Sequence, residues 1–142
     1  MDFKFDVKVK KNLTRQVQSK IVNGVKKDVR TIAQDLARTS SESAPHLTGN
    51  LEKSFTITYK SSGGVYKAEI KFSAVENGFD YAIAMHEWAY NLGEGSKRKP
   101  GGTGMSGKRY PIGRKFLTGV LQGEANAYAD YIKQQIRENL RT

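Results

Sequence analysis

The sequence predicts an α+β domain in which a small, mostly antiparallel β-sheet packs against two long α-helices, with a long basic glycine-rich loop. Two patterns carry this prediction. Apolar residues alternate with polar or charged ones over residues 3–9, 55–59 and 66–72, which is the period of a half-buried strand. Apolar residues recur every three or four positions over 13–36 and 117–140, as on one face of an amphipathic helix. The chain has 142 residues, so we expect a single domain over 1–142.

The first strand and the first helix follow directly from these patterns. In the strand, apolar residues alternate with charged ones: Phe3, Phe5, Val7 and Val9. Asn12 is a plausible cap for a helix that reaches about Thr39, because its side chain can accept a hydrogen bond from the first turn. The apolar stripe of this helix consists of Leu13, Val17, Ile21, Val25, Val29, Ile32 and Leu36. We interpret the apolar face of each strand as core rather than as a surface on which bases stack.

The stretch "SAPHLTGNLEKSF" lies between the first helix and the next strand. Pro45 stops the helix, because the residue before a proline disfavours the helical region. Gly49 permits a tight turn, and Thr48 or Asn50 can bond to the backbone there. We expect Leu51 to begin the strand with its side chain on the core face.

The second half of the chain alternates between strand and loop signals before it ends in a helix. "SSGG" at 61–64 predicts a hairpin turn, since glycines allow positive φ. "DYAIAMHEWAY" at 80–90 fits either a short buried strand or one or two helical turns. A flexible basic loop is expected over about 91–113. The closing helix carries a stripe of Leu117, Leu121, Ala125, Tyr128, Ile132, Ile136 and Leu140.

Positive charge is concentrated in the predicted loop. The chain has 24 Lys and Arg against 14 Asp and Glu, a net charge of +10. Residues 91–116 alone hold 7 basic and 1 acidic residue, a net +6. This distribution favours a loop that faces DNA or an acidic protein partner, and a solvated loop that keeps the protein soluble is the alternative. The residues we expect to carry this contact are Lys97, Arg98, Lys99, Lys108 and Arg109.

Composition argues against several classes of protein. The chain has no cysteine, which excludes disulfides and thiolate metal sites and fits a reducing cytoplasm better than secretion. Its N-terminus lacks the apolar stretch of a signal peptide, and no apolar run approaches the roughly 18 residues of a membrane span. We therefore expect a soluble domain that does not bind membranes.

No motif in the chain indicates catalysis or a cofactor. "GTGMSGKR" matches the glycines and lysine of a phosphate-binding loop, but Arg109 stands where Ser or Thr must hold Mg²⁺. No strand is expected before it, and Pro111 follows where a helix should begin. His46 and His86 are 40 positions apart, and the sequence around the second is not HExxH. We expect neither an enzyme, nor a metal site, nor a cofactor.

Three short blocks, taken in order, resemble a family of phage proteins. The first is a Pro-x-x-Thr-Gly-x-Leu-x-x-Ser stretch after the first long helix, the second a Tyr-Ala…His-Glu block, and the third a Gly-x-x-Phe-Leu block before the last helix. Together they resemble the neck, or tail-completion, proteins of long-tailed bacteriophages, which are often labelled minor capsid or tail-component proteins. The residues that carry the resemblance are Pro45, Thr48, Gly49, Leu51, Ser54, Tyr81, Ala82, His86, Glu87, Gly113, Phe116 and Leu117.

The resemblance implies a structural virion protein that forms a homo-oligomeric ring, a hexamer or a dodecamer, at the head–tail junction. It would assemble in the cytoplasm of the bacterial host, between the connector or head-completion protein and the tail-terminator or tail-tube protein. DNA would pass through the ring, and the basic loop would line the lumen or dock on an acidic protein. The motif residues Pro45, Thr48, Gly49, Leu51, Tyr81, Glu87, Phe116 and Leu117 would form the turn and the interface. The alternative is a small basic nucleic-acid-binding protein, which the charge alone supports.

Overall fold

The structure is a computed structural model that describes residues 2–8, 15–46, 49–88 and 90–141. The predicted strand residue Val9, the cap Asn12, the stripe residue Leu13 and the turn residue Thr48 lie outside the described residues. In chain order the elements are β1 (Asp2–Lys8), α1 (Arg15–Ser43), α2 (Asn50–Lys53), β2 (Phe55–Ser62), β3 (Val65–Phe72), β4 (Val75–Glu76), β5 (Phe79–Asp80), α3 (Tyr81–Glu87), α4 (Glu94–Lys97), β6 (Gly102–Thr103), β7 (Arg109–Tyr110) and α5 (Thr118–Arg141). A mixed helix and strand composition with a small antiparallel sheet is thereby confirmed.

The main sheet has the order β1-β3-β2, and both of its pairings are antiparallel. Ala68 at its centre lies opposite Phe5 on one side and Tyr59 on the other. The predicted hairpin turn is present, with Gly63 and Gly64 at φ 58° and 82°, which are left-handed values that suit a two-residue hairpin. The apolar face of the sheet is core, as its alternation predicted.

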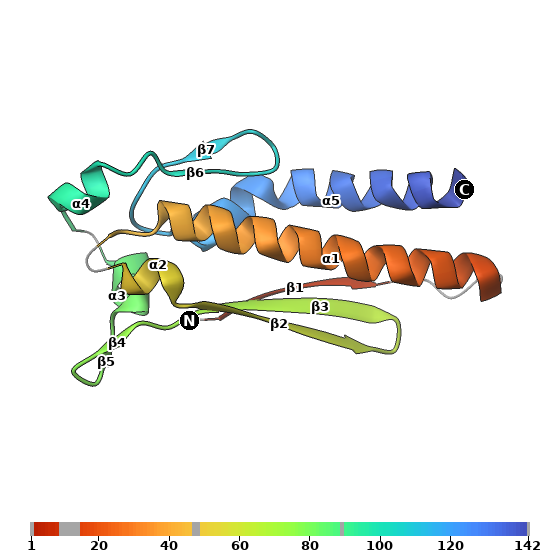
Figure 1. Cartoon of the computed structure of the whole chain (residues 1–142), viewed down its shortest axis with the longest axis horizontal. Coiled ribbons are helices and arrows are strands. Elements are labelled where there is room, and N and C mark those ends of the chain that lie inside the picture. Colours follow the sequence, from red (N-terminus) through yellow and green to blue (C-terminus); the bar gives the residue numbers. More distant parts are fainter. Residues whose placement is uncertain (1, 9–14, 47–48, 89, 142) are drawn as a thin grey trace.

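One long helix packs on that face, and a second packs against the first. α1, with 29 residues, runs across the sheet, and α5, with 24 residues, lies beside α1 (Figure 1). The helices approach closely where α1 has Gly24, because a Cβ there would come within 2.1 Å of Asn139 Nδ2 on α5. The core side chains between the layers include Val25, Ile32, Leu36, Ile70, Phe72, Phe116 and Leu117. Within the described residues, none of the helices is long and apolar enough to cross a bilayer.

The corner after α1 differs from the prediction in one detail. Leu51 is buried, as expected, but it belongs to the single helical turn α2, and the strand begins at Phe55. Gly49 adopts φ 86° and its carbonyl accepts from Lys53 N at 3.3 Å, which closes a helical turn that local alternation does not reveal. Ser54 ends the turn by donating both its N–H and its hydroxyl to the Leu51 carbonyl, at 3.1 and 2.7 Å.

The prediction of one flexible loop over 91–113 is wrong. The segment contains α4 and the β6–β7 hairpin. Residues 80–90, which fitted either a strand or helical turns, form the helix α3 over Tyr81–Glu87. A further hairpin, β4–β5, precedes it and was not predicted. Its turn residues Asn77 and Gly78 have φ 52° and 77°, again the left-handed pair of a two-residue hairpin.

Candidate functional site

The β6–β7 hairpin, which carries two of the predicted basic residues, lies directly against α1 (Figure 1). Gly102 N donates to Ser43 Oγ at 3.1 Å, and Thr39 Oγ1 donates to the Thr103 carbonyl at 3.4 Å. Gly102 permits this approach, because a Cβ in its place would lie 2.3 Å from the Thr39 carbonyl oxygen. The backbone of the hairpin is therefore held against α1 by hydrogen bonds with side chains of the helix.

A buried carboxylate on α5 holds the tip of this hairpin. Glu124 is fully buried, and its Oε1 accepts from Ser106 N at 2.8 Å. Its Oε2 accepts from Ser106 Oγ at 2.5 Å and from Tyr110 Oη at 2.6 Å. Burial acts to raise the pKa of Glu124, but the bonds from Ser106 and Tyr110 and the charge of Lys108 outweigh it and lower that pKa. Glu124 is thus held as a carboxylate.

A second carboxylate, on α1, grips the hairpin from the other side. Asp35 Oδ2 accepts from Met105 N at 3.1 Å and from Tyr128 Oη of α5 at 2.8 Å. Burial first, and then the bond to Asp35, raise the pKa of Tyr128, so this hydroxyl stays a donor. We call Asp35 and Glu124 the carboxylate clamp. It joins the hairpin to both long helices.

The predicted basic residues differ in what they contact. Lys97 is exposed, with its Nζ 4.0 Å from Glu94 Oε1, and Arg98 is exposed beside it. Lys99 turns inward: its side chain is only 16% exposed and its Nζ donates to the Ala44 carbonyl at 2.5 Å. Glu52 Oε2 lies 3.4 Å from the same nitrogen. Lys99 therefore ties the corner after α1 to the chain beyond α4, and does not present its charge to a ligand.

The other two predicted cations lie in a cleft with two that the prediction omitted. Lys108, Arg109, Arg114 and Lys115 line one cavity of about 320 Å³ beside the start of α5, and we call it the basic cleft. Arg109 Nε donates to the Pro100 carbonyl at 2.9 Å, while Lys115 pairs with Glu87. Arg114 and Lys115 fall within the basic segment 91–116, so the charge count already contained the signal.

The second and third motif blocks meet around a buried histidine. His86 Nε2 lies 3.2 Å from Thr118 N, which donates to it, so the ring proton sits on Nδ1, 3.0 Å from Glu87 Oε1. Burial lowers the pKa of His86, and Glu87 opposes this effect. The ring packs edge-on against Phe116, with centroids 5.2 Å apart. Lys115, at a left-handed φ of 62°, donates its N–H to the His86 carbonyl at 2.8 Å.

Several motif residues are buried within the subunit. Leu51, Tyr81, Phe116 and Leu117 are between 0% and 7% exposed, so their side chains pack inside the subunit. Pro45 and Gly49 are also buried, at the corner after α1. Glu87 is exposed, and its carboxylate joins His86 to Lys115 at the edge of the basic cleft.

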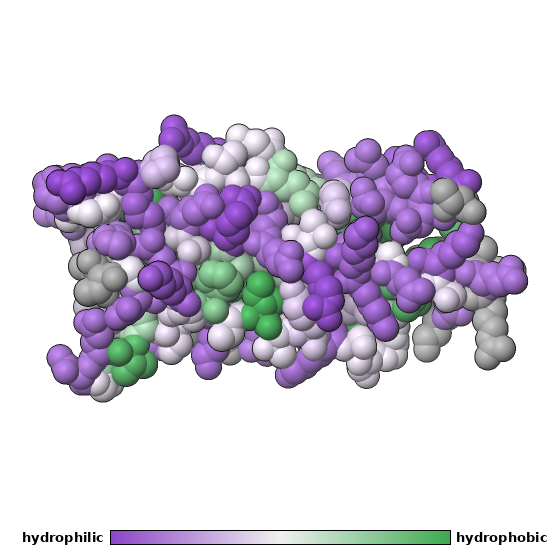
Figure 2. All heavy atoms as spheres, viewed as in Figure 1, coloured by the Kyte–Doolittle hydropathy of each residue, from purple (hydrophilic) through white to green (hydrophobic). Residues whose placement is uncertain are grey.

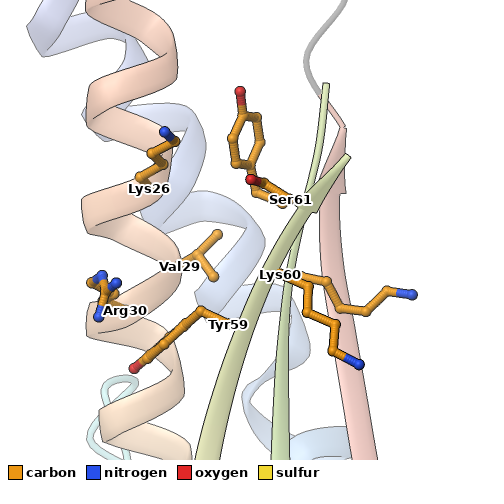
Figure 3. Close-up of a pocket in the computed structure, with 8 residues that line it drawn as sticks. Lys26, Val29, Arg30, Tyr59, Lys60 and Ser61 are labelled. Carbon is orange, nitrogen blue, oxygen red and sulfur yellow. The ribbon is translucent and has the colours of Figure 1, made fainter. Parts of the chain in front are cut away.

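A second cationic groove lies between α1 and the β2–β3 hairpin (Figure 3). Arg30 stacks over the Tyr59 ring, 4.2 Å from its centroid, and Lys26 Nζ lies 6.0 Å from the centroid of Tyr66. Figure 3 shows Lys60 pointing away from the helix, on the other face of the sheet. We call this 220 Å³ space the helix–sheet groove.

Within the part of the chain that the structure describes, His, Asp and Glu side chains form no group of three or more that could hold a metal ion.

Comparison of the chain with protein-family models, with curated proteins and with solved structures gave no match. The described residues form a mixed helix and strand fold with a small antiparallel sheet and with cationic grooves at two separate places.

Proposed function

We propose that this chain is a structural protein of the virion of a tailed phage or prophage. It forms a homo-oligomeric ring, a hexamer or a dodecamer, at the head–tail junction, as a neck or tail-completion protein. The observation that carries the proposal is the meeting of the motif blocks at 81–87 and 113–117 around His86, at the edge of the basic cleft. Blocks that are distant in sequence thus act as one structural unit.

In this proposal the two long helices are the scaffold and the basic glycine-rich segment is the surface that meets a partner. The carboxylate clamp fixes the hairpin in advance, so little conformational entropy is lost when the cleft binds. Lys108 and Arg114 would attract the phosphate backbone of DNA in the ring lumen without reading bases. The same cleft would alternatively dock on an acidic surface of the connector or the tail terminator.

One observation favours the second candidate, a small basic nucleic-acid-binding protein. In the helix–sheet groove, Lys26 and Arg30 lie over Tyr66 and Tyr59. Cations beside aromatic rings are a combination found on surfaces that bind single-stranded nucleic acid. This candidate predicts tight DNA binding by a monomer or dimer.

DNA binding by two matched variants separates the candidates. Lys108→Gln/Arg114→Gln alters the basic cleft and Lys26→Gln/Arg30→Gln alters the helix–sheet groove, and each removes the same charge. The neck proposal predicts weak, sequence-independent binding. The slope of log affinity against log salt concentration should become shallower by about 2 in the cleft variant only. Tight binding by a monomer, lost in the groove variant, would contradict the neck proposal and support the second candidate.

A further inference from the structure

Four large apolar side chains are exposed at the end of the molecule formed by β4, β5 and α3. Among the described residues, Val75, Phe79, Ile83 and Trp88 are 62%, 53%, 49% and 60% exposed. The rings of Phe79 and Trp88 lie 6.3 Å apart, tilted by 36°. We call the adjoining pair Phe79 and Trp88 the apolar patch. Figure 2 shows a small group of hydrophobic atoms at the β4–β5 corner, and another near the middle of the same, largely hydrophilic face.

The patch is held in place by polar contacts within its own segment. Asp80 Oδ1 accepts from Ala74 N and Ala82 N, both at 3.0 Å, and its Oδ2 accepts from Ser73 Oγ at 2.8 Å. The tight turn at Asn77 and Gly78 fixes the hairpin from its other end. Exposed aromatic side chains on a fixed support are typical of a protein–protein contact, because their burial costs little further ordering.

The charge around the patch differs from that of the rest of the chain. Residues 73–90 contain Glu76, Asp80 and Glu87 and no Lys or Arg, in a chain of net +10. Glu87 pairs with Lys115, so the negative charge beside the patch comes from Glu76 and Asp80. Two copies of such a chain repel each other unless the contact joins surfaces of opposite sign. The patch therefore suits contact with a basic surface on another copy.

A groove that fits this description lies between β1 and α5. It has a volume of about 410 Å³, and it is lined mainly by the apolar side chains of Phe5, Val7, Leu121, Ala125, Ala129 and Ile132. Lys8, Lys133 and Asp6 also line it. The patch cannot fill the groove of its own chain, because β4 and β5 lie at one end of the molecule and α5 runs toward the other (Figure 1).

We propose that the apolar patch of one copy docks into the β1–α5 groove of the next copy, with Phe79 and Trp88 as its anchors. This inference rests on the proposed function, since it names the subunit contact of the ring. Two different surfaces meet in it, so the contact is head-to-tail, and it builds a ring if the rotation closes and a filament if it does not.

The test uses one variant for each surface and a matched control, with mass measured by sedimentation. Trp88→Ser removes an anchor of the patch, and Phe79→Ser does so independently if the first variant misfolds. Ala129→Glu, at an exposed position on α5, blocks the groove. Leu140→Ser is the control, because Leu140 is an exposed apolar side chain, 51% exposed, that belongs to neither surface. We expect the wild type and the control to self-associate alike, and each surface variant to raise the dissociation constant about tenfold or more.

Mixing the two surface variants tests the pairing itself. Each variant keeps the surface that the other lacks, so the mixture should form a dimer and stop there. A wild type that stays monomeric up to about 1 mM overturns the inference, as does a mixture that forms no dimer. Rings that survive both variants refute this contact and leave the proposed function standing. Open chains built through this contact support the inference and contradict the ring.

Discussion

Replacing Glu124 with alanine tests how the basic hairpin is held. The substitution removes three hydrogen bonds at 2.5–2.8 Å, two from Ser106 and one from Tyr110. Ser106 is exposed, so water replaces its lost acceptor and each of its bonds contributes about 1 kcal/mol. Tyr110 is 7% exposed, and an orphaned buried hydroxyl costs about 1–3 kcal/mol. We therefore expect Glu124→Ala to lower the free energy of unfolding by about 4 kcal/mol.

The assay is urea unfolding followed by circular dichroism, together with limited proteolysis of the 102–110 segment. Glu138→Ala is the matched control, because Glu138 lies on the same helix in an exposed pair with Arg141, at 3.2 Å. It should change stability by less than about 0.5 kcal/mol. The lowered pKa of Glu124 also predicts how stability depends on pH. The stability that this carboxylate gives the wild type is present above pH 4.5, the usual pKa of a Glu side chain, and falls as the pH drops below that value. The difference between wild type and Glu124→Ala should therefore narrow in acid.

Two results would refute this reasoning. If Glu124→Ala costs no more than Glu138→Ala, the clamp does not hold the hairpin. If Tyr110→Phe and Glu124→Ala show additive effects in a double-mutant cycle, the bond between them contributes nothing, whereas we expect a coupling of about 1 kcal/mol or more.

Three further predictions concern buried groups. Asp28 is 2% exposed and its Oδ2 has no hydrogen-bond partner. Burial raises the pKa of Asp28, and the charge of Lys27 opposes this effect. Asp28→Asn should therefore stabilise the fold by about 1–3 kcal/mol at pH 7, as measured by urea unfolding. That gain should shrink as the pH falls toward 3.8, because the folded state takes up the proton more readily than the unfolded state. Burial lowers the pKa of His86, so the stability that this side chain contributes is complete above pH 6.5 and is lost below it. Thermal unfolding of His86→Asn at a series of pH values should lack this fall in stability. Gly102→Ala should cost about 1–3 kcal/mol in chemical denaturation, because its Cβ meets the Thr39 carbonyl, whereas Gly93→Ala, which faces open space, should be neutral.

Local signals predicted the turns and strands well where the signal was long enough. The glycines at 63 and 64 identified the β2–β3 hairpin because eight-residue strands flank them. Asn77-Gly78 carries the same turn chemistry, but β4 and β5 have two residues each, too few for alternation to show. The Asn-Gly pair between Glu76 and Phe79 nonetheless indicates a two-residue hairpin turn by itself.

Long-range contacts explain what the sequence did not predict. Residues 91–113 look like a flexible loop because they are rich in glycine and charge, yet Asp35 and Glu124, at distant points of the chain, order the hairpin within them. Glu124 itself sits on the buried side of α5, where a charged residue is not expected without a partner. The charge of Lys99 alone predicts a ligand contact, whereas its bond to the Ala44 carbonyl depends on the packing of the corner after α1.

The mass of the purified protein, measured by light scattering at low and high salt with negative-stain images of any large species, tests the neck proposal most directly. The proposal predicts closed rings with six or twelve times the 15.8 kDa mass of the chain. A monomer or dimer that instead binds DNA tightly, with binding that weakens steeply as salt is added, would contradict it.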